Sequence, residues 1–580
     1  MSQAELPRWD LDPLFADISS PEFKEARVRI RRGLDRFKKL LERYRVGEAD
    51  ASYDREAFDA VTAAYNELLE EIEPAGIYLR LRLAVDSSDR EAASELSGLE
   101  AELLELHKLE PRLTRWLAGF PADFEAGDYA RLLADSRCRA AHQMSDAEET
   151  LAAELSLSGR VAWDKLYGNV SSRITATVAG ESLPITAVRN LAHDASEETR
   201  RAAYDAELAA WSGRQDELAA CLNGVKGEAV TLARRRGWAD ELEPTLLANS
   251  VSRRALEAMN AAVEGSLEDW RRYFTAKANL LGKEKLDWWD LFAPVGAERR
   301  WSWEEARSFI IEQLSSFSPA AAELAQRAFR ERWIDAEPRT GKRGGAFCAH
   351  VGGGVSRVMA NYGGSFDDVS TLAHELGHAY HNSRLAKRPP LLRRTPMTLA
   401  ETASIMNETV ITRAALERLE GPEHLAVLDT WLQGAAQVVV DIHSRFLFES
   451  AVFERRRARE LTPEELSALM TTAQRQAYGD ALNTLHPYMW AVKPHYYYSD
   501  YYNYPYTFGL LFGLGLYAAY QEDPAGFGPR YDALLADTGL ADAATLAARF
   551  GFDIEDESFW RRGLDLLAGQ IGQLVAAAGA

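Results

Sequence analysis

The sequence predicts a mainly α-helical protein with a small antiparallel sheet next to one chemically distinctive helix. Apolar residues recur every three or four positions across most of residues 21–160 and 200–335, as they do along the buried face of a helix. The residue pattern changes in residues 339–368, which are rich in glycine and in short alternating stretches typical of strands. Residues 365–383 then return to a helical pattern.

Turn residues and a predicted hairpin divide the chain before residue 339 into separate helical segments. After an extended lead-in, residues 1–20, we expect helices over 56–85 and 90–107. Turn residues are expected to interrupt the helices at residues 73–76, 119–127 and 135–138. The stretch ITATVAGESLPI alternates β-forming residues around an Ala-Gly pair and predicts a hairpin. A new helical series follows it, so we expect a first helical lobe, residues 1–190, and a second body, residues 191–580.

Composition narrows the class of protein. The 580 residues carry 67 Lys and Arg against 88 Asp and Glu, a net charge of −21, which disfavours nucleic acid and anionic membranes as partners. The first fifteen residues lack the basic and apolar regions of a signal peptide, and the apolar run at 508–520 is too short to span a bilayer. Three cysteines far apart in the sequence indicate a reducing compartment. We therefore expect a soluble cytoplasmic protein.

One short motif carries the chemistry. His374, Glu375 and His378 form the pattern H-E-x-x-H, and two histidines four residues apart project from one face of a helix. Such a pair can hold one zinc ion, with the glutamate close to a water on the metal. Ser365 and Asp368 have the spacing of a capping box, which predicts that a helix begins here. The alternative is an amphipathic helix with a histidine pair on its surface.

A third metal ligand is expected in the next helical segment, residues 398–419. Zinc in a hydrolase usually takes three protein ligands and keeps one position for water. Glu401 and Glu408 are seven residues apart, on one helix face, in a partly apolar neighbourhood where an uncompensated carboxylate would be costly. We assign Glu401 as the third ligand and Glu408 as the group that orients a ligand histidine. The alternative is that both are ordinary carboxylates on a helix surface.

The sequence HELGHAYH followed by AETASIMNE resembles the thermolysin-like zincins, and more narrowly peptidase family M3 in its oligoendopeptidase F branch. The resemblance is strongest from about residue 340 to 510. It implies a two-lobed helical metallopeptidase with a deep cleft, in which residues 191–580 form the catalytic domain. It also implies that His374, His378 and Glu401 bind zinc, that Glu375 is the general base, and that the substrates are short unstructured peptides.

A tyrosine-rich stretch, HPYMWAVKPHYYYSDYYNYPYTFG, follows later in the chain, with seven tyrosines between residues 496 and 506. Tyrosine offers an apolar ring and a hydroxyl donor, which suits both a binding groove and charge stabilisation on a carbonyl oxygen. An aromatic core or a surface patch explains the composition equally well. The stretch resembles the substrate-clamping loop of oligoendopeptidase F relatives. This likeness implies His495 and Tyr506 as catalytic donors and Tyr501, Tyr502 and Tyr504 as substrate-binding residues.

Several other residues are of types that can bind metal or ligands, but we expect them to have structural roles. These are Cys348, His350, His443 and the pair Trp288–Trp289. A strand is expected at residues 356–362, and its free edge would pair with an extended peptide.

Together these features predict a zinc endopeptidase that acts on short peptides, although cobalt or manganese could use the same ligands. Two alternatives remain. One is a zinc carboxypeptidase or dipeptidase, in which Arg357 or Lys493 would hold the carboxylate of the substrate. The other is a peptide-binding protein without catalytic activity.

Overall fold

The computed structural model describes residues 6–579, so the first five residues of the predicted lead-in lie outside the described part. Helices dominate, as the sequence predicts. The chain forms two compact units, each made of three segments. The first unit comprises the described part of Met1–Ala141 with Arg299–Ala414 and Ala519–Phe550, and the second comprises His142–Glu298, Ala415–Ala518 and the described part of Gly551–Ala580. The boundary expected near residue 190 divides the sequence in another way and stays a prediction.

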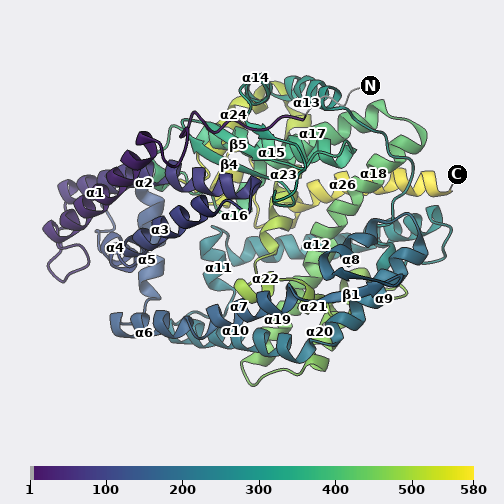
Figure 1. Ribbon diagram of the computed structural model, residues 1–580, viewed down its shortest axis with the longest axis horizontal. Coiled ribbons are helices and arrows are strands. Elements are labelled where there is room, and N and C mark those ends of the chain that lie inside the picture. Colours follow the sequence, from purple (N-terminus) through teal and green to yellow (C-terminus); the bar gives the residue numbers. More distant parts are fainter. Residues whose placement is uncertain (1–5, 580) are drawn as a thin grey trace. The chain divides into compact units, whose positions relative to one another are not determined.

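Helices make up most of the first unit. They are α1 (Pro21–Arg43), α2 (Arg55–Val85), α3 (Arg90–His107), α4 (Glu110–Ala118), η1 (Gly127–Tyr129), α5 (Ala130–Ala141), α13 (Trp303–Phe317), α14 (Pro319–Arg330), α15 (Phe366–Leu385), η4 (Pro390–Leu392), α16 (Met397–Ala400), most of α17 (Thr402–Arg418), α24 (Pro524–Ala536) and α25 (Ala543–Ala548). Helices α1 and α2 lie side by side (Figure 1) and bury aromatic side chains such as Phe23, Phe37 and Phe58 between them and their neighbours.

Two of the expected turns are wrong. Helix α2 continues through Pro74, and α5 continues through residues 135–138. Beyond Pro74, the side chains of Tyr78 and Leu79 are buried in the core of the first unit, so packing keeps the chain helical past the proline.

The sheet of the first unit has the strand order β3–β5–β4, with β3 (Ile334–Asp335), β4 (Phe347–Gly352) and β5 (Val355–Met359). Strands β4 and β5 pair in antiparallel fashion, and helix α15 packs against both (Figure 1), which confirms the small antiparallel sheet next to this helix. The short strand β3, parallel to β5, was not expected. Strand β5 also ends three residues before the predicted strand end at 362.

The second unit is also helical. Its elements are α6 (Asp146–Ser156), α7 (Arg160–Ser171), β1 (Thr175–Val178), β2 (Glu181–Pro184), α8 (Ile185–Asn190), η2 (Leu191–His193), α9 (Glu197–Ser212), α10 (Gln215–Arg235), α11 (Glu243–Ala248), α12 (Arg253–Leu280), η3 (Trp288–Asp290), α18 (Gly421–Ala436), the π-helix η5 (Gln437–Asp441), α19 (Ile442–Arg456), α20 (Pro463–Tyr478), α21 (Met489–Val492), α22 (His495–Tyr498), most of α23 (Tyr504–Glu522) and α26 (Glu557–Gly579). Helices α12 and α26 lie along each other (Figure 1).

The predicted hairpin is confirmed. Strands β1 and β2 pair in antiparallel fashion and are joined by Ala179 and Gly180, both with positive φ, at 51° and 84°. Positive φ at both central residues is the signature of a tight hairpin turn.

One continuous helical run, residues 421–456, is long and apolar enough to cross a membrane by length and composition, yet 61% of its most apolar window is buried inside the structure. Core helices of soluble proteins pass the same test, so this run is weak evidence for a membrane span.

Candidate active site

Helix α15 carries the H-E-x-x-H motif, and its start is fixed as the sequence predicts. The Ser365 hydroxyl accepts a hydrogen bond from the backbone N–H of Asp368, and the Asp368 carboxylate accepts one from the backbone N–H of Ser365. Asp367 and Asp368 also place negative charge at the positive end of the helix. The two histidines therefore lie one turn apart on one face of a well-defined helix.

Gly377 lets a second segment of backbone approach this helix. A Cβ built on Gly377 would lie 2.5 Å from the carbonyl oxygen of Ala403 and 2.6 Å from the Cα of Ser404. The Asn407 side chain spans the same contact and donates a hydrogen bond to the carbonyl oxygen of Ala373. The start of α17 is thus held directly against the middle of α15, which brings Glu401 to the histidines.

His374, His378 and Glu401 converge on one point. The Glu401 Oε2 atom lies 3.2 Å from His374 Nε2 and 3.4 Å from His378 Nε2. One nitrogen or oxygen from each side chain lies within 4.8 Å of the others. Across residues 6–579 this is the sole group of three or more His, Cys, Asp or Glu side chains close enough to hold one metal ion.

Two further side chains hold these donors in place. The Glu408 carboxylate lies 3.1 Å from His374 Nδ1, on the opposite side of the ring from Glu401. The Ser404 hydroxyl donates a hydrogen bond of 2.8 Å to Glu401 Oε2. A carboxylate on the far nitrogen of a ligand histidine fixes the orientation and tautomer of the ring.

The protonation of the donors follows from their neighbours. Burial alone would raise the pKa of Glu401, but a hydrogen bond from His374 and the charges of both histidines lower it to about 2. Burial and the charge of His374 lower the pKa of His378 to about 4. For His374, burial opposes the charged form, yet hydrogen bonds to Glu401 and Glu408 raise its pKa well above the usual value. A metal ion bound here would replace the proton on His374.

Glu375 has no partner for one of its oxygens. The residue is 6% exposed, and its Oε2 atom is buried without a hydrogen bond to any group in residues 6–579. Burial raises the pKa of Glu375 to about 7, and the nearby Glu401 carboxylate adds to the effect. A buried carboxyl with an unused oxygen and a pKa near neutrality is poised to exchange a proton with a small molecule.

The aromatic stretch lies in the second unit and forms a cluster of four rings. His495 stacks on Tyr502 with ring centres 4.8 Å apart, and Tyr498 packs edge-on against both rings. The Tyr506 hydroxyl donates a 3.3 Å hydrogen bond to the Tyr502 hydroxyl. Tyr498 is 43% exposed and was not singled out from the sequence. Tyr498 follows His495 by three residues on the short helix α22, so the two side chains share a helix face. This spacing could have indicated from the sequence that Tyr498 belongs to the cluster.

Tyr501 and Tyr504 lie differently. Tyr501 is 7% exposed and stacks on Phe453, and Tyr504 is 2% exposed and donates a hydrogen bond to the carbonyl oxygen of Thr245. Their burial argues for packing, and their predicted contact with substrate stays a prediction.

A buried ionic network supports the backbone between the aromatic rings. The Lys226 ammonium donates to Glu449, to Asp500 and to the carbonyl oxygen of Ser499, while Glu449 also accepts the backbone N–H of Tyr501. Tyr501 has a φ of 49°, an uncommon value for a residue other than glycine. The network therefore holds a strained turn in the middle of the aromatic stretch.

Of the residues expected to be structural, Cys348 has ordinary surroundings, whereas His350 Nε2, His443 Nδ1 and Trp289 Nε1 are buried without a hydrogen-bond partner in residues 6–579. The Cys348 thiol accepts a hydrogen bond from Asn382, and burial raises its pKa far above the usual range.

The Arg357 guanidinium is buried and donates to the carbonyl oxygens of Asp10 and Ser356. Arg357 is therefore occupied by the backbone and is a poor candidate for holding a substrate carboxylate.

A model of peptidase family M3 matches residues 190–566, and a model described as oligopeptidase F matches residues 116–175. The chain belongs to peptidase family M3. The resemblance seen in the H-E-x-x-H segment is thereby confirmed, and the family implies a metal ion for which the His-His-Glu group is the candidate site.

Curated relatives of this M3 chain carry related descriptions. It is 26% identical over 381 residues to an oligoendopeptidase F homolog of Lactococcus lactis, a match that covers 65% of this chain and 63% of the relative. It is 25% identical over 327 residues to oligopeptidase PepF of Bacillus subtilis, covering 55% and 49%. These matches span less than two thirds of the relatives' own lengths. A match to an oligoendopeptidase F homolog of Borreliella burgdorferi, 22% identical, covers 90% of this chain and 89% of the relative.

Solved structures share the fold of this M3 chain along nearly all of its length. A peptidase from Chlamydophila abortus superposes with a TM-score of 0.83 at 20% identity, covering 98% of both chains. The oligoendopeptidase F of Enterococcus faecium superposes with a TM-score of 0.65 at 18% identity, covering 95% of this chain and 98% of that one. These structures confirm the predicted fold class.

Proposed function

We propose that this chain is a zinc-dependent endopeptidase that hydrolyses internal bonds of short, unstructured peptides. The observation that carries the proposal is the convergence of His374 Nε2, His378 Nε2 and Glu401 Oε2 beside Glu375, which has a buried and unpartnered carboxyl oxygen. Membership of peptidase family M3 and the descriptions of its relatives point to the same reaction.

The donor set suits zinc. Two nitrogens and one oxygen are ligands that zinc accepts in hydrolases, with one position left open. Ligands at about 2.1 Å from a tetrahedral zinc ion lie about 3.4 Å from each other. The separations of 3.2 and 3.4 Å between the Glu401 oxygen and the two histidine nitrogens agree with that value. When bound, zinc supplies a positive charge that polarises a carbonyl group and makes a coordinated water more acidic.

Glu375 would move the proton. Its carboxylate accepts a proton from the attacking water and delivers it to the nitrogen of the leaving amine, because its pKa of about 7 favours transfer in both directions. Glu408 acts through His374, whose ring it holds in one orientation.

The aromatic cluster would serve the substrate. We propose His495 and Tyr506 as donors to the carbonyl oxygen on which negative charge develops. Burial and nearby cations lower the pKa of His495 to about 4, so its ring is neutral near pH 7 and donates through one nitrogen. Tyr502, which stacks on His495, is proposed to contact the peptide, with Tyr501 and Tyr504 as further substrate-binding candidates.

We also propose a cytoplasmic location and a catalytic domain spanning residues 191–580.

The experiment that tests the proposal uses a peptide blocked at both ends and its unblocked counterpart. We expect the chain, loaded with zinc, to cut the blocked peptide at internal bonds, as seen by mass spectrometry. Glu375→Gln should keep the metal, measured by elemental analysis, and lose at least about a hundredfold in turnover. Glu323→Gln, an exposed glutamate on α14 in the same unit, is the matched control and should keep full activity.

Two results would contradict the proposal. If only the unblocked peptide were shortened, from its C-terminus, the chain would be a carboxypeptidase. If neither peptide were cut by protein that has its zinc, the chain would be a binding protein.

A further inference from the structure

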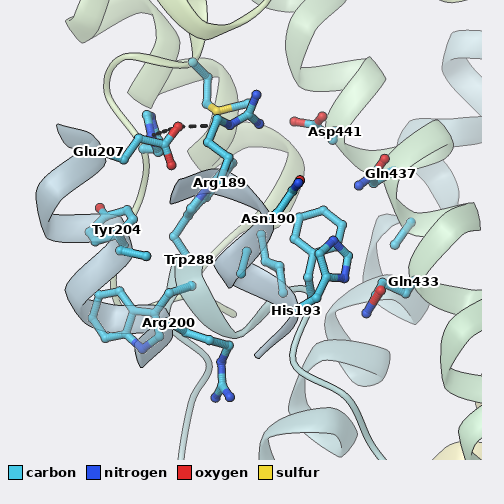
Figure 2. A pocket seen from close by; sticks show the side chains of 18 of the residues that line it. Arg189, Asn190, His193, Arg200, Tyr204, Glu207, Trp288, Gln433, Gln437 and Asp441 are labelled. Atoms are coloured by element: carbon cyan, nitrogen blue, oxygen red, sulfur yellow. Dashed lines mark ion pairs between the residues drawn. The ribbon is translucent and has the colours of Figure 1, made fainter. Parts of the chain in front are cut away.

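A cavity lies entirely within the second unit, and the proposed reaction assigns no role to the residues that line it. Its volume is about 340 Å³, the lower range of pockets that bind small molecules. Figure 2 shows Asn190 and His193 on one wall, facing Gln433 and Gln437 on the other. The first wall comes from α8 and η2, and the second from α18 and the π-helix η5. Single turns of π-helix are rare and occur frequently at functional sites.

One cation of this cavity, Lys493, makes no direct ion pair within residues 6–579. Every other side chain of fixed charge in the lining has one: the pairs are Arg189–Glu207 at 3.0 Å, Arg200–Asp290 at 2.9 Å and Asp441–Arg445. Lys493 also lines the cavity and has no such pair in the described chain, although the Asp441 and Glu207 carboxylates of the same lining are near enough to attract its charge. Burial and the charge of Arg445 lower the pKa of Lys493 to about 7, as expected for a cation without a direct partner.

Uncharged polar groups of the cavity are also without partners. The Tyr478 hydroxyl belongs to a residue that is 3% exposed, and it makes no hydrogen bond within the described chain. His486, a residue with no exposed surface, has Nε2 3.5 Å from the Glu207 carboxylate, and its Nδ1 makes no hydrogen bond within residues 6–579. The amides of Asn190, Gln433 and Gln437 also line the cavity, but Asn190 and Gln437 are exposed to solvent and Gln433 is half-buried. Buried polar groups are nearly always satisfied, so the Tyr478 hydroxyl and the His486 ring point to a polar ligand or to water.

The remaining lining is largely apolar, with aliphatic residues such as Val188, Leu291 and Met489 and several aromatic rings. Tyr204, Phe274, Trp288 and Phe292 contribute rings to the walls. The sequence had favoured a packing role for Trp288, but its ring borders the cavity as well as packing on Tyr478 and His486. A ligand that satisfied Lys493 would therefore have an apolar group beside its charge.

We propose that this cavity binds a small molecule in which a single carboxylate adjoins an apolar side chain, the chemistry of a free amino acid or of the C-terminal residue of a short peptide. The Arg189 and Arg200 guanidinium groups of the lining are already paired with carboxylates, which leaves one ammonium group. One free cation matches a monoanion, whereas phosphate sites usually present several cations or a fork of guanidinium donors. The carboxylate would accept from Lys493 and Tyr478, and the apolar side chain would lie against Trp288 and Phe292.

Calorimetric titration of the complete, metal-loaded chain tests this proposal directly. The probes are N-acetyl-L-phenylalanine, which mimics a peptide C-terminus, free L-phenylalanine, and N-acetyl-L-phenylalaninamide, which lacks the carboxylate. We expect saturable binding of at least one of the two acids and no binding of the amide. Tighter binding of N-acetyl-L-phenylalanine would indicate a peptide C-terminus as the ligand, and tighter binding of L-phenylalanine would indicate a free amino acid. Either preference supports the proposal.

Matched variants locate the binding. Lys493→Met should weaken binding by about ten- to a hundredfold, because it removes a hydrogen bond to a charged group. Lys165→Met makes the same change at an exposed lysine of the same unit and should leave binding unchanged. Tyr478→Phe removes one hydroxyl and should weaken binding by about three- to tenfold.

The proposal is overturned by any of three results. These are no binding of either acid, equal binding of acid and amide, and binding that Lys493→Met and Tyr478→Phe both leave unchanged. The third result would place the carboxylate elsewhere, as at the metal ion. Cleavage of the peptide blocked at both ends needs no carboxylate at Lys493, so this proposal and the proposed endopeptidase function can fail separately.

Discussion

Gly377 and Ser404 come so close that no side chain fits between them. A Cβ on Gly377 would lie 2.6 Å from the Cα of Ser404, closer than real Cβ atoms approach other heavy atoms. Ser404 in turn donates a hydrogen bond to Glu401. The glycine inside the H-E-x-x-H motif thus sets the distance between the helix that carries the histidines and the segment that carries the third donor.

We predict that Gly377→Ala both destabilises the protein and weakens its hold on metal. The added methyl group meets backbone rather than a movable side chain, so helices α15 and α17 must separate. The cost of such overpacking is about 1–3 kcal/mol. Thermal unfolding and metal content after dialysis measure the two effects.

Gly168→Ala is the control for that change. Gly168 lies in helix α7, and a Cβ there would meet no atom within 4 Å. We expect this variant to keep its metal and to be unchanged or more stable, by up to about 1 kcal/mol. Wild-type metal content in Gly377→Ala would show that the close contact is unnecessary for the site.

Glu408 offers a prediction about metal affinity alone. Glu408→Gln replaces the carboxylate on His374 Nδ1 with a neutral amide. Loss of such an orienting partner typically costs about ten- to a hundredfold in metal affinity. Competition with a chelator of known affinity measures the change. Glu417→Gln, an exposed position on the same helix, should bind zinc as the wild type does. Equal affinities for the two variants would mean that Glu408 does not orient the ring.

The start of α15 and the hairpin were predictable because their signals are local. A capping box spans Ser365 to Asp368, and the hairpin turn depends on Ala179 and Gly180 alone. The motif H-E-x-x-H is local too. Glu401 could be predicted to lie near the histidines because it follows them along the chain after one short connection, and its role as a ligand stays a prediction.

Other features depend on contacts between distant residues, and the sequence does not reveal these. Helix α2 passes through Pro74 because Tyr78 and Leu79 are buried against other helices. Tyr501 and Tyr504 have the same residue type as Tyr502 and Tyr506, yet only their tertiary neighbours decide which rings are buried. The cavity around Lys493 is assembled from segments that are far apart in the sequence, so no spacing could have indicated it.

Within the aromatic stretch we predict a division of roles between Tyr506 and Tyr504. Tyr506→Phe removes the proposed donor to the developing negative charge and should lower kcat about a hundred- to a thousandfold, with a small change in KM. Tyr504→Phe removes a buried hydrogen bond to Thr245 and should lower the unfolding temperature with little change in kcat. Steady-state kinetics and thermal unfolding of both variants decide the matter. A large loss of kcat in Tyr504→Phe, with normal activity in Tyr506→Phe, would reverse the assignment.

His443 leads to a prediction about stability in acid. The residue is 4% exposed in helix α19, its Nδ1 atom has no hydrogen-bond partner among residues 6–579, and burial lowers its pKa to about 4. The Glu264 carboxylate lies 3.5 Å from Nε2 but is 58% exposed, so water screens its attraction. In the unfolded chain the pKa of histidine is about 6.5. Between these two pKa values the unfolded chain binds a proton that the folded chain does not, and the folded state therefore loses stability as the pH falls.

We expect this single group to cost about 2 kcal/mol at about pH 5 relative to about pH 7.5. His443→Gln should remove that part of the acid sensitivity, because glutamine does not titrate. Urea unfolding of the wild type and the variant at both pH values gives the difference. His107→Gln, at an exposed position in helix α3, should leave the pH dependence as it is. If the wild type and His443→Gln lost stability in parallel, the histidine would be charged in the fold and paired with Glu264 after all.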